Sequence, residues 1–365
     1  IGLVGSEMCI RDRYGSDTLS THALMRGGVM QLHRWGVLDK LKSAGTPPIR
    51  TTSFHYGDEE LCLPIKAKNG VDALYAPRRT VLDSLLVDAA REAGAQVEYG
   101  VRLVNLLRSE DGRVTGVVVK NHDGREIRVR ANLVIGADGM RSSVARLVGS
   151  ELRRSGRHAS GVVFGYFSGL DIDGFHWYYR PGVSAGAIPT NDGLTCVFAA
   201  MPDSRFRKEI ASDVASGYYR ILQECDSELA REVGLAERVG NFRGFAGELG
   251  FMRRCWGPGW ALVGDAGYFR DPITAHGITD AFIDAELLSR AVVQGALSHY
   301  ESLRNDLSEG LFDITDFIAS YDWDLRSVKE QHLLLSKEMS REVKMLTQLD
   351  SQELMLSSQP VALAS

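Results

Sequence analysis

The stretch that decides the fold is GWALVGDAG, at residues 259–267, followed shortly by DPITAHGIT at residues 271–279. Its apolar part, Trp260 to Val263, predicts a buried strand that ends in a tight Gly-Asp-Ala turn. A proline-bearing loop comes next, and then Gly277 begins a helix with an apolar face. An acid at the end of a parallel strand can bind a cofactor hydroxyl, and the N–H groups at a helix start favour an anionic group. The stretch therefore predicts a cofactor-binding turn.

Composition limits the kinds of protein this chain can be. Its 365 residues are enough for one large or two ordinary domains, and a net charge of −5 gives no reason to expect nucleic acid. No apolar run approaches the ~20 residues of a membrane-spanning helix, and no secretory signal is recognisable. The five cysteines are scattered and the nine histidines show no zinc-like cluster, so we predict no metal site. Dispersed cysteines suit reduced thiols, and we expect a cytoplasmic protein.

A second turn of the same kind occurs earlier in the chain. The run LVI at residues 133–135 is typical of a strand buried in a parallel sheet, and GADGMRS follows at residues 136–142. Glycines at a strand end allow a sharp turn and close approach of a ligand, which would place Asp138 and Arg141 beside a cofactor cleft. The alternative is an ordinary strand-to-helix turn capped by Ser142.

Three other groups of polar residues have both a functional and a structural interpretation. Arg78 and Arg79 precede a helix, where they can reach a phosphate or a ribose or simply be surface charges. The helix dipole disfavours cations there, which favours a functional role. The hydroxyls of DTLSTH, at residues 17–22, can cap the helix that follows. For His276 we favour a loop histidine near the cofactor or solvent over a catalytic base.

Apolar periodicity places the helices. Helical spacing covers residues 24–42, 80–92 and 277–296, and the pattern stays helical from 297 to about 356.

Strand patterns fill the rest. Residues 97–134 read as short strands joined by Asp-Gly hairpin turns at 111–112 and 123–124. From about 151 to 249, aromatic and β-branched residues recur at strand spacing. This change in the residue pattern predicts a second domain built on a mixed or antiparallel sheet.

Together these motifs resemble the FAD-dependent flavoprotein monooxygenases of class A, typified by para-hydroxybenzoate hydroxylase. The turn at residues 137–139 matches the family's Asp-Gly motif. Its Gly-Asp motif is matched by residues 264–266 together with Pro272 and Gly277. The segment from Arg79 to Asp83 fits the family's position for an arginine near the flavin. Two matches in the right order, about 125 residues apart, are far more specific than either alone.

The resemblance covers roughly residues 15–296 and implies FAD as cofactor. Asp265 would bind the ribityl chain, and backbone groups from Ala275 to Ile278 would face the pyrimidine edge of the ring and stabilise negative charge there. The backbone of Leu103 would meet the adenine. The implied cofactor-binding residues are Arg79, Leu103, Asp138, Gly264, Asp265, Pro272, Ala275, Gly277 and Ile278.

The implied reaction is carried by the cofactor, and we assign no catalytic side chain. NAD(P)H would bind transiently and supply hydride. Reduced flavin would then react with molecular oxygen, through a flavin hydroperoxide, to hydroxylate or epoxidise a small organic substrate. One alternative is reduction of carbon–carbon double bonds, as in the geranylgeranyl reductases. Another is halogenation, which we rank low. Halogenases carry Trp-x-Trp-x-Ile-Pro, and here Ile188 and Pro189 follow Ser184 and Gly186 at the tryptophan positions.

The start of the chain departs from the family pattern, because the glycine-rich turn for the adenosine diphosphate part of FAD is absent there. Residues 4–13 resemble the translation of sequencing-adapter DNA. We therefore expect residues 1–13 to be a non-native artefact and the first βαβ unit to be missing, with the native fragment beginning near Tyr14 or Gly15. An inactive truncated fragment unable to bind FAD is the alternative from another functional class.

We therefore expect an α/β fold. A Rossmann-like, parallel-sheet FAD-binding domain of the glutathione reductase and hydroxylase type would be interleaved with a mixed or antiparallel substrate domain and followed by C-terminal helices. The FAD-binding segments would be 14–50, 75–150 and 251–296, the substrate domain 51–74 and 151–250, and the C-terminal helical extension 297–365. Aromatic walls suit an organic substrate, although core packing is the simpler interpretation of any one aromatic residue. The pocket candidates are Phe164, Tyr166, Trp177, Tyr179 and Phe198.

Overall fold

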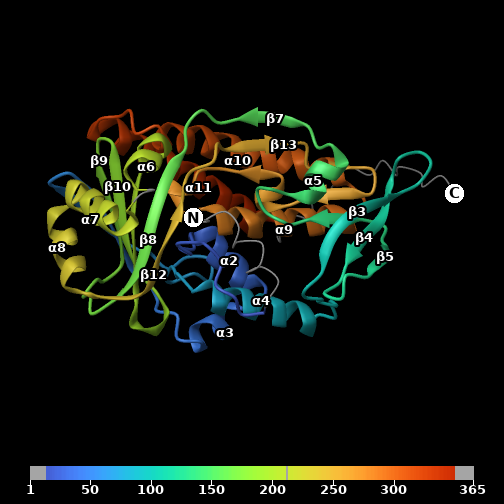
Figure 1. The fold of residues 1–365 in the computed structure, drawn as a ribbon, viewed down its shortest axis with the longest axis horizontal. Helices are drawn as coiled ribbons and strands as arrows, with labels where there is room; N and C mark the ends of the chain where they lie inside the picture. The colour runs from blue at the N-terminus through green and yellow to red at the C-terminus, as the bar shows by residue number, and fades with distance from the viewer. Residues whose placement is uncertain (1–13, 211–212, 350–365) are drawn as a thin grey trace.

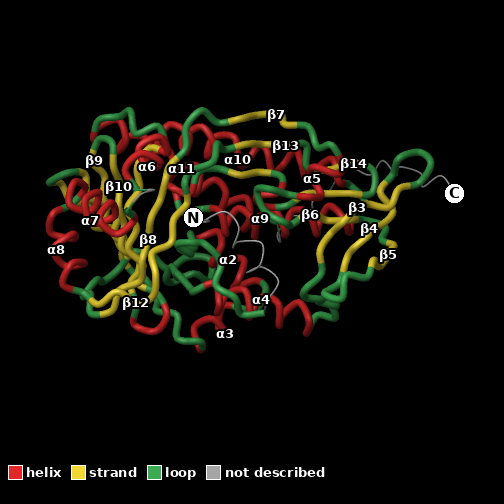
Figure 2. Tube along the Cα trace, viewed as in Figure 1, coloured by secondary structure: helices red, strands yellow, loops and turns green. Residues whose placement is uncertain are grey.

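The computed structural model describes residues 14–210 and 213–349. The prediction about residues 1–13, and the part of the helical extension beyond residue 349, lie outside the described residues. Figure 1 shows a large sheet with flanking helices at one end of the molecule and smaller sheets toward the other, with long C-terminal helices behind both. Strands and helices are distinguished by colour in Figure 2.

The large sheet has seven strands in the order β12-β8-β11-β10-β9-β1-β2. Neighbouring strands run antiparallel except β1 and β9, which are parallel. The sheet is therefore mixed, as the strand pattern predicted. Its strands are β1 (Thr51–Tyr56), β2 (Glu59–Pro64), β8 (Ser160–Ser168), β9 (Phe175–Arg180), β10 (Val183–Pro189), β11 (Thr195–Pro202) and β12 (Glu237–Phe245).

Both faces of the central strands β8, β10 and β11 are covered, which explains their nearly continuous apolar sequences. One face, with Val163 and Val197, packs under three short helices. The opposite face, with Phe164, Trp177 and Phe198, belongs to the main core of the molecule. Successive side chains on a strand point to opposite faces, so neighbouring residues of one strand, such as Val163 and Phe164, belong to different cores. The three covering helices are α6 (Asp203–Glu209), α7 (Val214–Cys225) and α8 (Ser227–Leu235).

A short parallel pair carries the two turns singled out in the sequence. β6 (Val134–Gly136) and β15 (Trp260–Leu262) are parallel and in register, and β14 (Trp256–Gly257) pairs with β15. Within the described residues β6 has a partner strand on one edge only. Ile135 is 48% exposed, whereas a strand inside a parallel sheet is normally covered on both sides.

Two further small sheets complete the strands. The first is the meander of β3 (Arg102–Arg108), β4 (Val114–Lys120) and β5 (Glu126–Arg130), whose turns carry Gly112 and Gly124 as predicted. The second has the order β16-β13-β7. Its strands are β7 (Leu152–Ser155), β13 (Phe251–Arg253) and β16 (Tyr268–Phe269).

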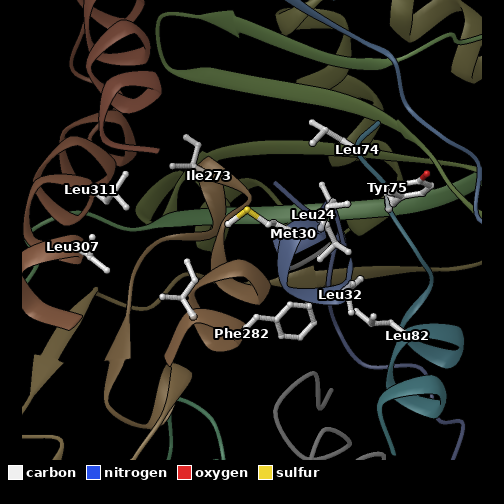
Figure 3. Packing of buried hydrophobic residues seen from close by; sticks show 14 of the residues in the cluster. Leu24, Met30, Leu32, Leu74, Tyr75, Leu82, Ile273, Phe282, Leu307 and Leu311 are labelled. Atoms are coloured by element: carbon white, nitrogen blue, oxygen red, sulfur yellow. The ribbon is translucent and has the colours of Figure 1, made fainter. Parts of the chain in front are cut away.

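Helices pack around these sheets. α9 (Gly277–Val293) contacts α2 (Arg26–Arg34) and α10 (Leu297–Ala319), and α11 (Leu325–Gln348) packs on α10 and α2. Figure 3 shows this core, where Met30 and Leu32 approach Phe282 while Leu307 and Leu311 lie on the neighbouring helix. None of the described helices meets the length and hydropathy needed to cross a bilayer.

The first predicted helix is two helices. α2 ends at Arg34, and α3 (Leu38–Ser43) begins after Gly36, whose φ of 69° breaks the helical path. α2 has Met25 at its N-cap and no side-chain cap, so the hydroxyls of residues 17–22 do not cap it. The helices α4 (Arg79–Glu92) and α5 (Ser143–Val148) lie where the sequence predicted them.

Candidate functional site

The Gly-Asp turn after β15 is held by the helix that follows it. Gly264 has a φ of 54°, and a Cβ there would lie 3.1 Å from the Cβ of Ala281 on α9. The amide of Gly264 donates a hydrogen bond of 2.8 Å to Oδ2 of Asp284, also on α9. Asp265 is only half-buried at this strand end. The turn that carries Asp265 is therefore held against α9.

The N-terminus of α9 is open. Ala275 adopts a left-handed conformation with a φ of 50°, and His276 is the N-cap. Gly277 is exposed, and a Cβ placed on it would have no neighbour within 4 Å. The first N–H groups of a helix have no partner inside the helix, so this end can receive an anionic group. Ile278 is half-buried against the core behind it, and Pro272 is exposed on the loop.

Asp271 ties this loop to the large sheet. One carboxylate oxygen accepts a hydrogen bond of 2.6 Å from the amide of Ser160 on β8, and the other accepts one of 3.0 Å from the amide of Ile273. Burial raises the pKa of Asp271 to about 6, while these hydrogen bonds act in the opposite direction. The loop before α9 is therefore fixed relative to the aromatic face of the sheet.

His276 is buried in an ionic network, so the expectation of a loop histidine near the cofactor or solvent is wrong as regards solvent. Its exposure is 1%. Nδ1 lies 3.1 Å from Oδ1 of Asp280, and Nε2 lies 3.5 Å from Oε1 of Glu342 on α11. Arg270 contacts both carboxylate oxygens of Asp280, at 2.8 and 3.1 Å. This network links α11 to the open end of α9.

Burial and the charges in this network shift the pKa values of its two carboxylates in opposite directions. Burial alone would raise the pKa of Asp280, but the charges of Arg270 and His276 outweigh it and hold that pKa below its usual range. Burial raises the pKa of Glu342 to about 7, although the charge of His276 opposes that rise. Because Arg270 already contacts both oxygens of Asp280, the cluster is better described as an internal ion pair than as a cation site.

Asp138 acts as a helix cap in this structure. Oδ2 accepts hydrogen bonds from the amides of Ser143 and Val144, at 2.7 and 3.2 Å, and Oδ1 accepts one from the hydroxyl of Ser142. Ser142 in turn caps α5 by accepting from the amide of Ala145 at 2.9 Å. The structural alternative from the sequence, a turn capped by Ser142, is therefore present, and Asp138 reinforces it.

The other two predicted cofactor residues lie apart from the α9 end. Arg79 forms a bidentate ion pair with Asp83 one helical turn along α4, at 2.7 and 2.8 Å. Leu103 lies on β3 opposite Val119 of β4 and is partly buried against the core. The structure thus packs the turn at Gly264–Ala266 against α9, whereas Arg79 and Leu103 belong to other elements.

A second polar cluster lies at the edge of the aromatic face. Oδ2 of Asp17 contacts the guanidinium of Arg78 at 2.7 Å and that of Arg243 at 2.8 Å. The Arg78 guanidinium lies 3.8 Å over the Tyr166 ring, which suits a cation–π contact. Nε2 of His22 is 3.0 Å from the Tyr166 hydroxyl.

His22 is neutral in this cluster. Burial, reinforced by the charge of Arg78, lowers the pKa of the imidazole to about 3. Its Nδ1 lies 3.1 Å from the backbone carbonyl of Ala76. Because a carbonyl only accepts, Nδ1 carries the proton, and Nε2 accepts from the Tyr166 hydroxyl. The cluster therefore joins residues 17–22 to Arg78, two of the polar segments for which the sequence offered both a functional and a structural interpretation.

All five pocket candidates are buried in the main core. Tyr179 packs against His332 of α11 and Trp323, with ring centroids 4.4 and 6.4 Å apart, and Trp177 packs against Phe198 at 6.1 Å. Tyr166 differs because it contacts the polar cluster. Core packing is therefore observed for each candidate.

Sequence reasoning missed Arg243 and Glu342. Both join residues far away in the chain, and neither stands in a recognisable motif. A single charged residue in a strand or helix is usually solvated, so no local signal marked either of them.

Comparison with known proteins defines the class. Residues 5–240 match the family described as "FAD binding domain", which is more than half of the chain. The chain therefore belongs to this FAD-binding family of oxidoreductases, and the prediction of a FAD-dependent, hydroxylase-like family is confirmed.

Particular relatives carry different activities. The chain is 26% identical over 280 residues to digeranylgeranylglycerophospholipid reductase 1 of Methanococcoides burtonii, a match that covers 71% of this chain and 65% of that protein. Its structure resembles that of a triple mutant of the flavin-dependent brominase Bmp2, with a TM-score of 0.75 and 18% sequence identity. The match covers 93% of this chain and 92% of the brominase.

Its structure also resembles that of PqsL of Pseudomonas aeruginosa, a probable FAD-dependent monooxygenase, with a TM-score of 0.67 and 18% sequence identity. The match covers 88% of this chain and 89% of PqsL. At these identities the structural likenesses define the fold alone. They confirm the predicted FAD-binding α/β fold.

Proposed function

We propose that the chain acts as a FAD-dependent oxidoreductase that uses NAD(P)H and molecular oxygen to hydroxylate or epoxidise a small organic substrate. The observation that supports this most directly is that the turn carrying the partly buried Asp265 packs against α9, whose first residue Gly277 is exposed. A carboxylate at a strand end and free N–H groups at a helix start are the donor and acceptor sets that a ribityl chain and a flavin ring require.

The residues around α9 fit a flavin. Asp265 would accept hydrogen bonds from ribityl hydroxyls, and the amides of Gly277 and Ile278 would bind the pyrimidine edge of the ring. Open space at Gly277 leaves room for this contact. When bound, FAD would supply the redox chemistry. The chain's own contribution is to orient the ring and to stabilise negative charge there with the helix N-terminus.

Several of the predicted roles remain proposals. The ion pair between Arg79 and Asp83 would have to open before Arg79 could reach a cofactor phosphate. Asp138 would act through the position of α5, whose N-terminus it caps. The domain division given above and a substrate pocket on the aromatic face are proposals too, with Tyr166 as the candidate nearest to polar groups.

A cytoplasmic location is supported by the free state of Cys62, Cys196, Cys225 and Cys255.

Reduction of carbon–carbon double bonds is the second candidate, favoured by the sequence similarity to a digeranylgeranylglycerophospholipid reductase. Halogenation is less favoured despite the structural likeness to a brominase. A Cβ at Gly186 would lie 2.3 Å from the Phe198 ring, so the tryptophan of the halogenase motif has no space there.

The deciding experiment is the visible absorption spectrum of the purified chain before and after reconstitution with FAD. Stoichiometric flavin supports the proposal, whereas no flavin after reconstitution identifies a fragment unable to bind it. Oxygen uptake coupled to NADH or NADPH oxidation, compared with anaerobic reduction of an isoprenoid alkene, then separates monooxygenase from reductase. The variant Asp265→Ala should weaken FAD binding.

A further inference from the structure

Three side chains with ligand atoms meet at the free edge of the large sheet, away from the site described above. They are His55 on β1, Glu60 on β2 and His176 on β9. His55 lies directly opposite Glu60 on one side and opposite Tyr178 on the other, and His176 precedes Tyr178 by two residues. This register places all of them on one face of the sheet. One nitrogen or oxygen from each of the three lies within 4.8 Å of the others.

The face that carries them is opposite the aromatic face. Tyr178 belongs to the core under α7 and α8, whereas Phe54 and Tyr179, its neighbours on the other side, belong to the main core. The end of the sheet with β9 lies beside α7 and α8 in Figure 1. The cluster is therefore separated by the sheet from the Gly264 turn and from the polar cluster around Asp17.

The orientation of His176 is fixed by the backbone. Its Nε2 lies 3.0 Å from the carbonyl oxygen of Asp173. A carbonyl accepts only, so Nε2 carries the proton, and Nδ1 of a neutral ring presents a lone pair. That lone pair faces Nε2 of His55 at 3.0 Å. A histidine whose second nitrogen donates to a backbone carbonyl is the usual arrangement of a metal ligand.

The second histidine is also held in place. The His55 ring stacks on Tyr178, with centroids 4.2 Å apart and an angle of 7° between the planes. Glu60 lies beside it on β2, an edge strand that is exposed along its whole length. Two oriented imidazoles and one adaptable carboxylate therefore form the cluster. Little conformational freedom would be lost on binding, except at Glu60.

The distances suit one kind of ion. Zn–N bonds of 2.0–2.1 Å at a tetrahedral angle place two nitrogens roughly 3.3 Å apart, close to the observed 3.0 Å between the rings. Magnesium and calcium prefer sites made of oxygen ligands alone. Two neutral imidazoles with one carboxylate carry a single negative charge, which suits a divalent ion with a fourth position open to solvent.

We propose that His55, Glu60 and His176 bind one divalent transition-metal ion of the zinc type, and that this ion clamps the β1–β2 edge to β9. On binding, the proton on Nε2 of His55 moves to Nδ1 of the same ring, so no proton has to leave the imidazoles. No metal site was predicted from the sequence, because these residues are scattered over 121 positions and only the strand pairing brings them together.

The test is metal titration of the full chain, purified without a polyhistidine tag and stripped with a chelator. Cobalt(II) is followed by its visible d–d absorption, and zinc(II) by competition and calorimetry. We expect one ion per chain with a dissociation constant below about 100 μM. His176→Gln and Glu60→Gln should each weaken binding by at least about tenfold. His122→Gln, in an exposed histidine outside the cluster, should leave the affinity unchanged.

The variants keep the proposal falsifiable even if a histidine replacement disturbs folding, because Glu60 is exposed and its replacement should be tolerated. Weaker binding than the stated limit in the unmodified chain overturns the proposal. So does binding that survives both His176→Gln and Glu60→Gln, since the ion would then lie elsewhere, for example at His276. The experiment needs no FAD, so its outcome is independent of the proposed oxidoreductase function.

Discussion

The amide nitrogen of Gly264 donates a 2.8 Å hydrogen bond to Oδ2 of Asp284, which joins the Gly-Asp turn to the second turn of α9. Asp284 is 2% exposed, and burial raises the pKa of its carboxyl to about 7, against the influence of Arg304 and of the Gly264 hydrogen bond. One buried acid therefore holds the Gly-Asp turn against α9.

Replacing Asp284 by alanine should destabilise the chain by about 1–3 kcal/mol, because the Gly264 amide would lose its partner in a buried place. Asp284→Asn keeps an acceptor oxygen and should cost less. Urea unfolding of both variants at pH 7 measures this. Equal losses in the free energy of unfolding for the two variants would show that the hydrogen bond from Gly264 does not contribute to stability.

The same residue predicts a pH dependence. The folded pKa of Asp284, about 7, lies above the value of about 3.9 expected for an unfolded aspartate. Its contribution to stability is therefore complete below about pH 4 and is lost as pH rises through 7. Asp284→Asn should flatten this part of the stability profile, which unfolding at a series of pH values between 4 and 8 would reveal. An unchanged profile would mean that Asp284 does not titrate in this range.

His22 predicts that stability changes with pH in the opposite direction. Burial lowers its folded pKa to about 3, below the unfolded value of about 6.5. Its contribution is present above about pH 6.5 and is lost as pH falls towards 3. Asparagine tolerates the φ of 51° found at this position, so His22→Asn should fold and should lose less stability than the unmodified chain between pH 7 and pH 5. His122→Asn, at an exposed site, should lose as much as the unmodified chain.

Local patterns were sufficient to predict the elements that carry the candidate flavin site. The strand at Trp260, the helix beginning at Gly277 and the hairpin turns at Gly112 and Gly124 are all present, because each depends on neighbouring residues. The capping role of Ser142 was also predictable, since a hydroxyl two or three residues before a helical amide is a local signal.

Partnerships between distant residues were not predictable. Arg243 reaches Asp17 only because β12 pairs with β8, and Glu342 reaches His276 only because α11 packs against α2 near the start of α9. Neither contact has a periodic signature in the sequence. The break after Arg34 was missed for a different reason. Apolar spacing continues through Gly36, and the left-handed glycine ends the helix without disturbing that spacing.

In the Asp17 cluster, we expect a single isosteric replacement to lower the free energy of unfolding measurably. Asp17→Asn removes the negative charge between the guanidinium groups of Arg78 and Arg243, which would then repel each other across a mostly buried gap. We expect a loss of about 1–3 kcal/mol in the free energy of unfolding. Glu224→Gln, which breaks the exposed ion pair with Arg205, should cost less than about 1 kcal/mol. A loss for Asp17→Asn no larger than that of this control would contradict the prediction.

Two aspartates at strand ends should respond differently to the same replacement. Asp138 accepts hydrogen bonds from the amides of Ser143 and Val144, so Asp138→Ala should lower stability by about 1–2 kcal/mol, as loss of a helix cap does. Asp265 lies in the turn that packs against α9, so we expect Asp265→Ala to weaken FAD binding by at least about tenfold. Denaturation without FAD and flavin fluorescence titration measure the two effects separately. If Asp265→Ala destabilised the chain as much as Asp138→Ala and left FAD affinity unchanged, the Gly-Asp turn would be a structural turn, and the proposed flavin site would lose its main support.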